Sequence, residues 1–344
     1  MSTWLTAVPP TLPTHERWFV DSHQAGDWSF FFSPLPLVLT AAVVVVSVIW
    51  RQVALRVDRP ELPQLSRLGR LVPWVPRLLA IHLGVALLAL AATGSFITPS
   101  NDHLEGPGGS ALLLVEGALG VWLVSGFRVR AAAALVLGLG PALAFVAGPT
   151  ALGECANLAA VAAFLVVLPP SGDAHGAVRA TPEQLRLALV LLRVGVGIAL
   201  VVLAFSEKLT NPVMALHTLE EYPQLDVFGL VGIDVAPETF VVIAGAVELL
   251  FGLLVISGAF PQVAVLVAMV PFNATLLIFG QTEMVGHLPV YGVFLALLVY
   301  GSNASTAPAV RWLPGRGRSR TRSGSRILAT EPGTTPSPVT SPAV

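Results

Sequence analysis

The sequence of 344 residues is poor in charge. Asp, Glu, Lys and Arg make up 11% of it, and 54% of its residues are hydrophobic. A soluble domain carries about 25% charged residues. This scarcity excludes an ordinary soluble domain and predicts a polytopic membrane protein. The net charge of −1 provides no basic field that would attract nucleic acid, so we expect no nucleic-acid partner.

Cysteine is also nearly absent. The single cysteine, Cys155, excludes an intramolecular disulfide, a CxxC redox pair and a cysteine-rich metal site. Redox chemistry would therefore need a bound cofactor or a partner subunit. Residues 1–33 contain no early apolar stretch, so we expect no cleavable leader there.

Long apolar runs are plentiful. A spanning helix needs about 20 mostly apolar residues, and the pattern predicts an all-α fold of about nine transmembrane helices in contact with the lipid bilayer. Their expected ranges are 30–50, 76–97, 109–126, 130–148, 152–169, 185–206, 238–257, 261–280 and 286–301.

Arginine gathers in alternate loops and in the tail. The arginine-bearing segments lie around residues 51–77, 128–130, 179–186 and 311–326, whereas the loops between them carry acids such as Asp102, Glu105, Glu220 and Glu221. By the positive-inside rule the arginine loops are cytoplasmic. We therefore expect a multi-pass protein of a prokaryotic plasma membrane, with its N-terminus outside and its C-terminus in the cytoplasm.

The chain contains an internal repeat. Residues 115–126 and 247–258 share the pattern V-E-x-x-x-G-x-x-x-x-S-G without a gap. The flanks match as well, and the expected pairs are Gly84 with Gly195, Pro141 with Pro271, Gly148 with Gly280 and Glu154 with Glu283. We expect two parallel four-helix units related by an axis along the membrane normal.

This repeat defines the expected domain organisation. Residues 1–29 form an extracytoplasmic segment and residues 30–75 a leader helix with a basic linker. Residues 76–170 form a degenerate unit and residues 171–301 a second unit. Residues 302–344 form a basic tail that is expected to be disordered.

Ionisable residues inside apolar segments are the candidate site residues. Such a group costs about 2.5–3.5 kcal/mol on insertion scales, so it is a functional-site candidate. Glu248 and Glu116 occupy matching positions in the two units. Each carboxylate either handles a proton or ligand, or forms a hydrogen bond to a neighbouring helix for packing alone.

Three further candidates lie near helix ends. Glu283 and His287 are spaced i, i+4, which suits one helix face, although Gly286 and Pro289 leave the start of that helix open. The pair either lines a pocket or caps the helix, and two ligands alone do not make a metal site. Glu207 and Lys208 either line the same pocket or extend to the interface, and Arg193 extends to the cytoplasmic face by default.

Residues 193–300 contain a set of short motifs in a fixed order. They are Arg193-Val194-Gly195, Phe205-Ser206-Glu207-Lys208-Leu209 with Pro212, Glu248-x-x-x-Gly252, Gly258 and Gly286-His287. In these motifs the segment resembles the DoxX family of small prokaryotic membrane proteins. Family members are single four-helix units, and the resemblance implies that the unit is duplicated here with the degenerate copy first. Gly94-Ser95-Phe96-Ile97 stands where the first copy would carry Glu-Lys, so we expect the second unit to hold the site.

Two functional hypotheses follow. The first, implied by the resemblance, is a membrane subunit of a quinone-linked redox system with a redox partner subunit. In it Glu248, His287 and Glu283 are catalytic, and Glu207, Lys208, Glu116 and Arg193 bind the ligand. The second is a small-solute transporter or a membrane scaffold without catalysis.

The predicted topology can be checked with reporter fusions. A reporter fused within residues 210–235 is expected to be active outside the cytoplasm, because this acidic loop alternates with the arginine loops. A fusion within residues 179–186 is the matched control and is expected to report the cytoplasm. A cytoplasmic signal from residues 210–235 would contradict the topology.

Overall fold

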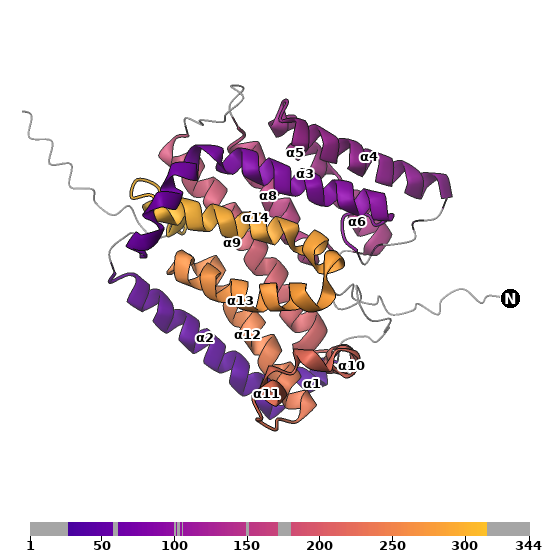
Figure 1. Ribbon diagram of the computed structural model, residues 1–344, viewed down its shortest axis with the longest axis vertical. Coiled ribbons are helices and arrows are strands. Elements are labelled where there is room, and N and C mark those ends of the chain that lie inside the picture. Colours follow the sequence, from indigo (N-terminus) through magenta and orange to yellow (C-terminus); the bar gives the residue numbers. More distant parts are fainter. Residues whose placement is uncertain are drawn as a thin grey trace, which may run out of the picture. The chain divides into compact units, whose positions relative to one another are not determined.

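Helices make up nearly all of the described structure. The computed structural model describes residues 27–57, 61–99, 101, 104, 106–148, 151–170 and 180–314, and it has no strand in these ranges. In chain order (Figure 1) the elements are α1 (Trp28–Phe31), α2 (Pro34–Ala54), η2 (Pro63–Trp74), α3 (Val75–Thr93), α4 (Gly106–Ser125), α5 (Val129–Gly138), α6 (Gly140–Ala147), α7 (Ala151–Glu154), α8 (Ala156–Val167), α9 (Pro182–Leu203), η3 (Ala204–Leu209), α10 (Pro212–Glu221), η4 (Pro223–Leu225), α11 (Val227–Leu230), α12 (Pro237–Ser257), α13 (Pro261–Phe279), α14 (Gln281–Ser302) and α15 (Ala307–Val310).

The all-α membrane fold predicted from the sequence is confirmed. Eight helical segments in the described ranges are long and apolar enough to cross a membrane, and a ninth apolar helix, Ala156–Val167, is shorter. The predicted segment 152–169 is thus helical but broken, because α7 stops at Glu154 before α8 begins. The predicted segment 130–148 is also interrupted, between α5 and α6. Pro141 has no N–H to bond the carbonyl of Leu137, which favours a kink at this point.

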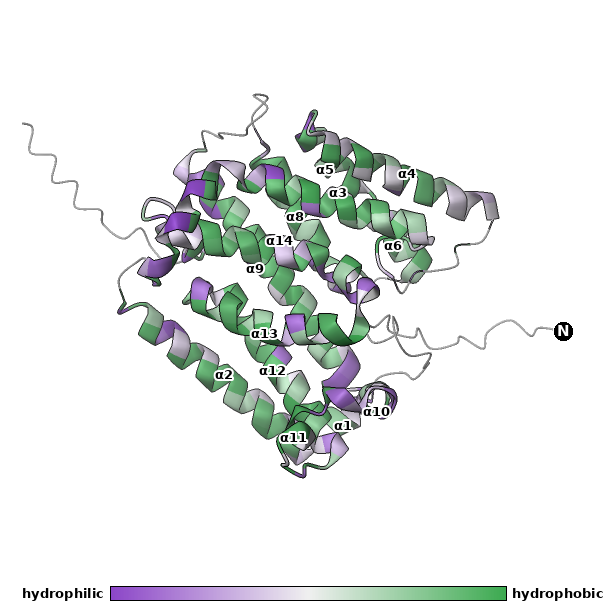
Figure 2. Cartoon of the chain, viewed as in Figure 1, coloured by the Kyte–Doolittle hydropathy of each residue, from purple (hydrophilic) through white to green (hydrophobic). Residues whose placement is uncertain are grey.

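Large apolar side chains cover the outward faces of these helices. Figure 2 shows apolar colouring along nearly every long helix. Leu114, Phe145 and Leu277 are 75%, 91% and 88% exposed, and α2 exposes a row of valines. A soluble monomer rarely leaves so much apolar surface in water. The chain is therefore an integral membrane protein, with these faces toward lipid.

The two repeats interlock. Within each repeat the first helix packs against the second, α3 on α4 and α9 on α12, and the third against the fourth, α5 on α8 and α13 on α14. The fourth helix of each repeat then packs against the first helix of the other, α8 on α9 and α14 on α3. The described residues from Asp27 to Leu313 consequently belong to one compact unit.

Paired glycines fix the closest helix contacts. A Cβ added to Gly84 would lie 2.8 Å from the carbonyl oxygen of Gly120, and one added to Gly197 would lie 2.8 Å from that of Gly252. Small residues let helix backbones approach this closely. The structural counterpart of Gly84 is therefore Gly197. The expected pairing with Gly195 was wrong by two residues, because Gly195 faces α8 instead.

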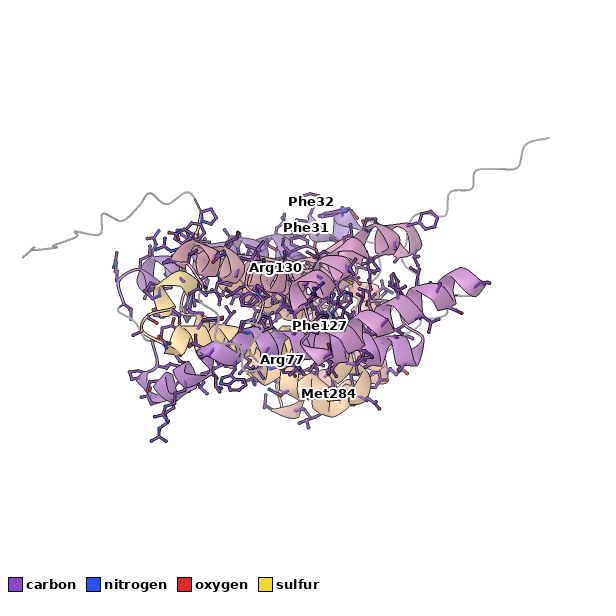
Figure 3. The ribbon with its side chains drawn as sticks, turned by 90° about the horizontal axis from the view of Figure 1, so that it is seen from above. Phe31, Phe32, Arg77, Phe127, Arg130 and Met284 are labelled. Atoms are coloured by element: carbon purple, nitrogen blue, oxygen red, sulfur yellow. The ribbon has the colours of Figure 1, made fainter. Side chains whose placement is uncertain are left out.

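One end of the helices, which we call the arginine side, comprises residues 51–57, 61–77, 126–128 and 303–313. Arg77 donates hydrogen bonds to the carbonyls of Leu123 and Val124 at the end of α4, and it lies beside Phe127 in Figure 3. In the second repeat Arg193 packs against the turn glycine Gly258 and donates to the carbonyl of Trp312. In each repeat an arginine of the first helix thus holds the turn that follows the second helix.

The glycine contact predicts opposite effects for two Gly→Ala substitutions. Gly197→Ala is expected to lower stability by about 1–3 kcal/mol, because the added methyl meets backbone and side-chain atoms of α12. Gly138→Ala is the matched control, since no atom lies within 4 Å of its added Cβ. It is expected to be neutral or stabilising by about 0.5–1 kcal/mol. Thermal unfolding of the purified protein in detergent measures both, and equal midpoints would contradict the close contact.

Candidate functional site

The segment η3 is a π-helix that continues α9 over Ala204–Leu209. Such π-segments are found frequently at functional sites. Here the segment brings Lys208 between two carboxylates. Its Nζ lies 3.1 Å from Glu207 Oε2 and 3.3 Å from Glu248 Oε2 on α12. We call these three residues the lysine cluster.

The lysine cluster is held in an apolar setting. The side chain of Glu207 is fully buried, and those of Lys208 and Glu248 are 17% and 21% exposed. Gly245 on α12 makes room for Lys208, because a Cβ there would lie 2.8 Å from the Lys208 Cβ. The rings of Phe31 and Phe205 pack against each other nearby, with centroids 5.3 Å apart. The three charges therefore interact with little screening from water.

Glu283 and His287 form a second polar group, which we call the histidine pair. The helix α14 begins at Gln281, five residues earlier than the predicted start at 286, so both side chains lie on one helix face. Glu283 Oε1 lies 3.1 Å from His287 Nδ1. Both side chains are buried, whereas their neighbour Met284 is 47% exposed and lies at the edge of the molecule in Figure 3.

A cavity adjoins His287. Its walls come from α3, the segment Ile97–Pro99, α7, α8, α9, α13 and α14. Its empty volume, which includes the open space at its mouth, is about 620 Å³. The lining is mostly aliphatic, and its side chains with polar atoms are Thr98, Glu154, Cys155, Asn157 and His287. Both repeats contribute to these walls.

Glu116 supports the wall of this cavity from behind. Its Oε1 accepts a hydrogen bond from the backbone N–H of Ile97, a cavity-lining residue, at 3.0 Å. Ile97 adopts a φ of 64°, which is rare for a β-branched residue. Glu116 is fully buried, and no described residue donates to its Oε2. The acid thus holds a strained backbone segment in place.

The predicted site residues fall into separate groups. Glu207, Lys208 and Glu248 come together, as do Glu283 and His287, while Glu116 contacts the Ile97 segment. Arg193 joins none of these groups. It lies on the arginine side, 14 residues before Glu207 and about 21 Å away along a helix.

Sequence reasoning gave too little weight to two residues. Glu154 was matched to Glu283 as part of the repeat but was not chosen as a site residue, although it lines the cavity. Lys208 is the only lysine in the chain, and that singularity was a signal for its special position.

Comparisons with family models, curated proteins and solved structures find no match to this chain. The chemistry of the site must therefore be inferred from its geometry. Among residues 27–314, where described, no group of three or more His, Cys, Asp or Glu side chains gathers as a metal ion would require.

Replacing Lys208 by a residue without an ammonium group tests how much the lysine cluster contributes to the stability of the protein. Lys208→Met is expected to destabilise the protein by about 1–3 kcal/mol, because two carboxylates lose the cation between them in a poorly solvated site. The double variant Lys208→Met/Glu248→Gln is expected to recover part of that loss. Thermal unfolding of the wild type, Lys208→Met, Glu248→Gln and the double variant in detergent gives the comparison. Additive losses in the double variant would show that Lys208 and Glu248 do not interact.

Proposed function

We propose that the protein binds the head group of a membrane quinone in the cavity between its repeats, as the membrane subunit of a quinone-linked redox system. The observation that carries this proposal is that His287 lines an aliphatic cavity, with its Nδ1 3.1 Å from Glu283 Oε1. An apolar pocket with a few oriented polar groups suits a flat apolar ring that carries oxygen acceptors.

The chemistry follows from the histidine pair. Reduction of a quinone consumes two electrons and two protons and gives the quinol. The Glu283 carboxylate beside Nδ1 favours the doubly protonated imidazolium, whose Nε2–H can give a hydrogen bond, and then its proton, to a quinone oxygen. The electrons come from a redox partner subunit, since the single cysteine provides no thiol pair.

The lysine cluster is proposed as the proton store for this reaction. Leu203 lines the cavity, and Glu207 follows it by four residues, about one turn further along the same helix. Glu207 therefore lies about one turn from the quinone site, and Lys208 connects it to Glu248 on α12. Neighbouring titratable groups of this kind can exchange protons with a bound ligand.

The proposal also includes the orientation of the chain in the membrane and its relationship to the DoxX family. The arginine side faces the cytoplasm of a prokaryote, and both polar groups lie toward the outer leaflet. The DoxX-like motif residues Glu207, Lys208, Glu248 and His287 are the residues that the structure gathers in the two polar groups. Their convergence supports membership in a duplicated DoxX-like group.

A second candidate function is small-solute transport. The observation that favours it is the position of the cavity at the interface of two interlocked repeats, where transporters built from repeats hold their substrates. Uptake of labelled solutes by vesicles containing the protein distinguishes the two functions. Uptake without quinone binding would favour transport.

Quinone binding tests the proposal directly. The purified protein is expected to contain co-extracted quinone and to bind decylubiquinone, a 1,4-benzoquinone with a ten-carbon tail. His287→Ala is expected to weaken this binding by about tenfold, equivalent to about 1.4 kcal/mol, because a buried hydrogen bond is lost. His217→Ala is the matched control, since His217 is exposed on α10. Equal affinities of the two variants would exclude His287 from the site.

A further inference from the structure

We infer that the cavity is a composite site in which Glu154 of the first repeat faces the ligand together with His287 of the second. This inference rests on the proposed function for the identity of the ligand. It reverses the expectation that the second repeat alone holds the site, and it gives a role to a residue that the sequence left as part of the repeat pattern.

The position of Glu154 carries the inference. Glu154 is the last residue of α7 and is only 9% exposed, yet it lines the cavity with its neighbours Cys155 and Asn157. His287 is 7% exposed and reaches the same cavity from α14. Aliphatic residues of α3 and α9, such as Leu90 and Leu200, make up much of the remaining wall. Two protonatable groups from different repeats thus meet one apolar space.

The two repeats differ in the chain that follows these acids. Glu283 lies in a continuous helix, so it meets His287 one turn later. Both acids follow a glycine with positive φ, Gly148 at 86° and Gly280 at 64°. However, α7 ends at Glu154, and the residue four positions later is the aliphatic Leu158, which lines the same cavity.

A 1,4-quinone matches such a site because its two oxygens lie at opposite ends of the ring. His287 would supply a proton to one oxygen and Glu154 to the other, so that two O–H bonds form as one N–H and one O–H bond break. The ring is reduced by two electrons from the redox partner, which is oxidised. Each side chain then regains its proton from water or from the lysine cluster.

Three variants test the role of Glu154 in the full-length protein. Glu154→Ala is expected to weaken decylubiquinone binding by about tenfold. Glu154→Gln is expected to retain binding, because its amide still donates a hydrogen bond, but to slow quinone reduction because it delivers no proton. Glu221→Ala removes an exposed acid of α10 and is expected to change neither quantity.

The single cysteine provides a second measurement that needs no substitution. Cys155 lines the cavity beside Glu154, so bound quinone should shield it from N-ethylmaleimide. At a decylubiquinone concentration about ten times the Kd, the alkylation rate is expected to fall about tenfold. Alkylation of the unfolded protein in the presence of the same quinone is the control and should stay constant.

The outcomes separate the two proposals. Wild-type binding with protection of Cys155 and weaker binding by Glu154→Ala supports the composite site. Binding without protection, or with equal affinity in Glu154→Ala, overturns the composite site and leaves quinone binding in place. If the wild-type protein neither binds decylubiquinone nor shows protection, the proposed function fails and the composite quinone site fails with it.

Discussion

In each repeat the backbones of the first two helices touch at one glycine pair, Gly84 with Gly120 and Gly197 with Gly252. This contact positions one acid on each second helix. Glu116 and Glu248 each precede the contacting glycine by four residues, one helical turn, so they lie along the same interface toward the end of the first helix. The chemical group that each carboxylate contacts there depends on how the first helix of its repeat ends.

The two first helices end differently, and this makes the site asymmetric. The helix α3 stops at Gly94, whose left-handed φ of 81° is the usual conformation of a helix C-terminus, and the chain then presents a backbone N–H to Glu116. The helix α9 continues as the π-segment η3 and presents an ammonium to Glu248. Because the repeats interlock, both endings lie close to the interface that contains the cavity.

The sequence predicted the helices well, because apolar runs of spanning length have few alternatives in a membrane. It also predicted that Glu283 and His287 suit one helix face. It did not predict the register of Gly84 against Gly197, since two glycines two residues apart in an aliphatic background look equivalent. The start of α14 was misplaced because Gly286 and Pro289 signal a helix end locally, whereas packing against α3 and α13 carries the helix through them.

Other features of the site depend on tertiary contacts that have no local pattern. In the π-segment, Lys208 packs against Gly245 of another helix. Glu154 faces a cavity whose walls come from seven parts of the chain. Sequence reasoning placed the acids in the correct helices, but it could not bring Glu154 together with His287, because their helices belong to different repeats.

The contacts of Glu116 and Glu248 can be compared to ask whether the two acids only stabilise helix packing. Glu116 accepts a hydrogen bond from the backbone N–H of Ile97. The side-chain oxygen of a glutamine could accept the same hydrogen bond without the desolvation cost of burying an ionisable group. Glu248 instead contacts a lysine. The two copies therefore share no contact type, yet both keep glutamate at the same position of the motif. What they share is a carboxyl group that can gain or lose a proton beside an apolar interface. The shared position beside the glycine contact, more than either individual contact, is what the two repeats have in common.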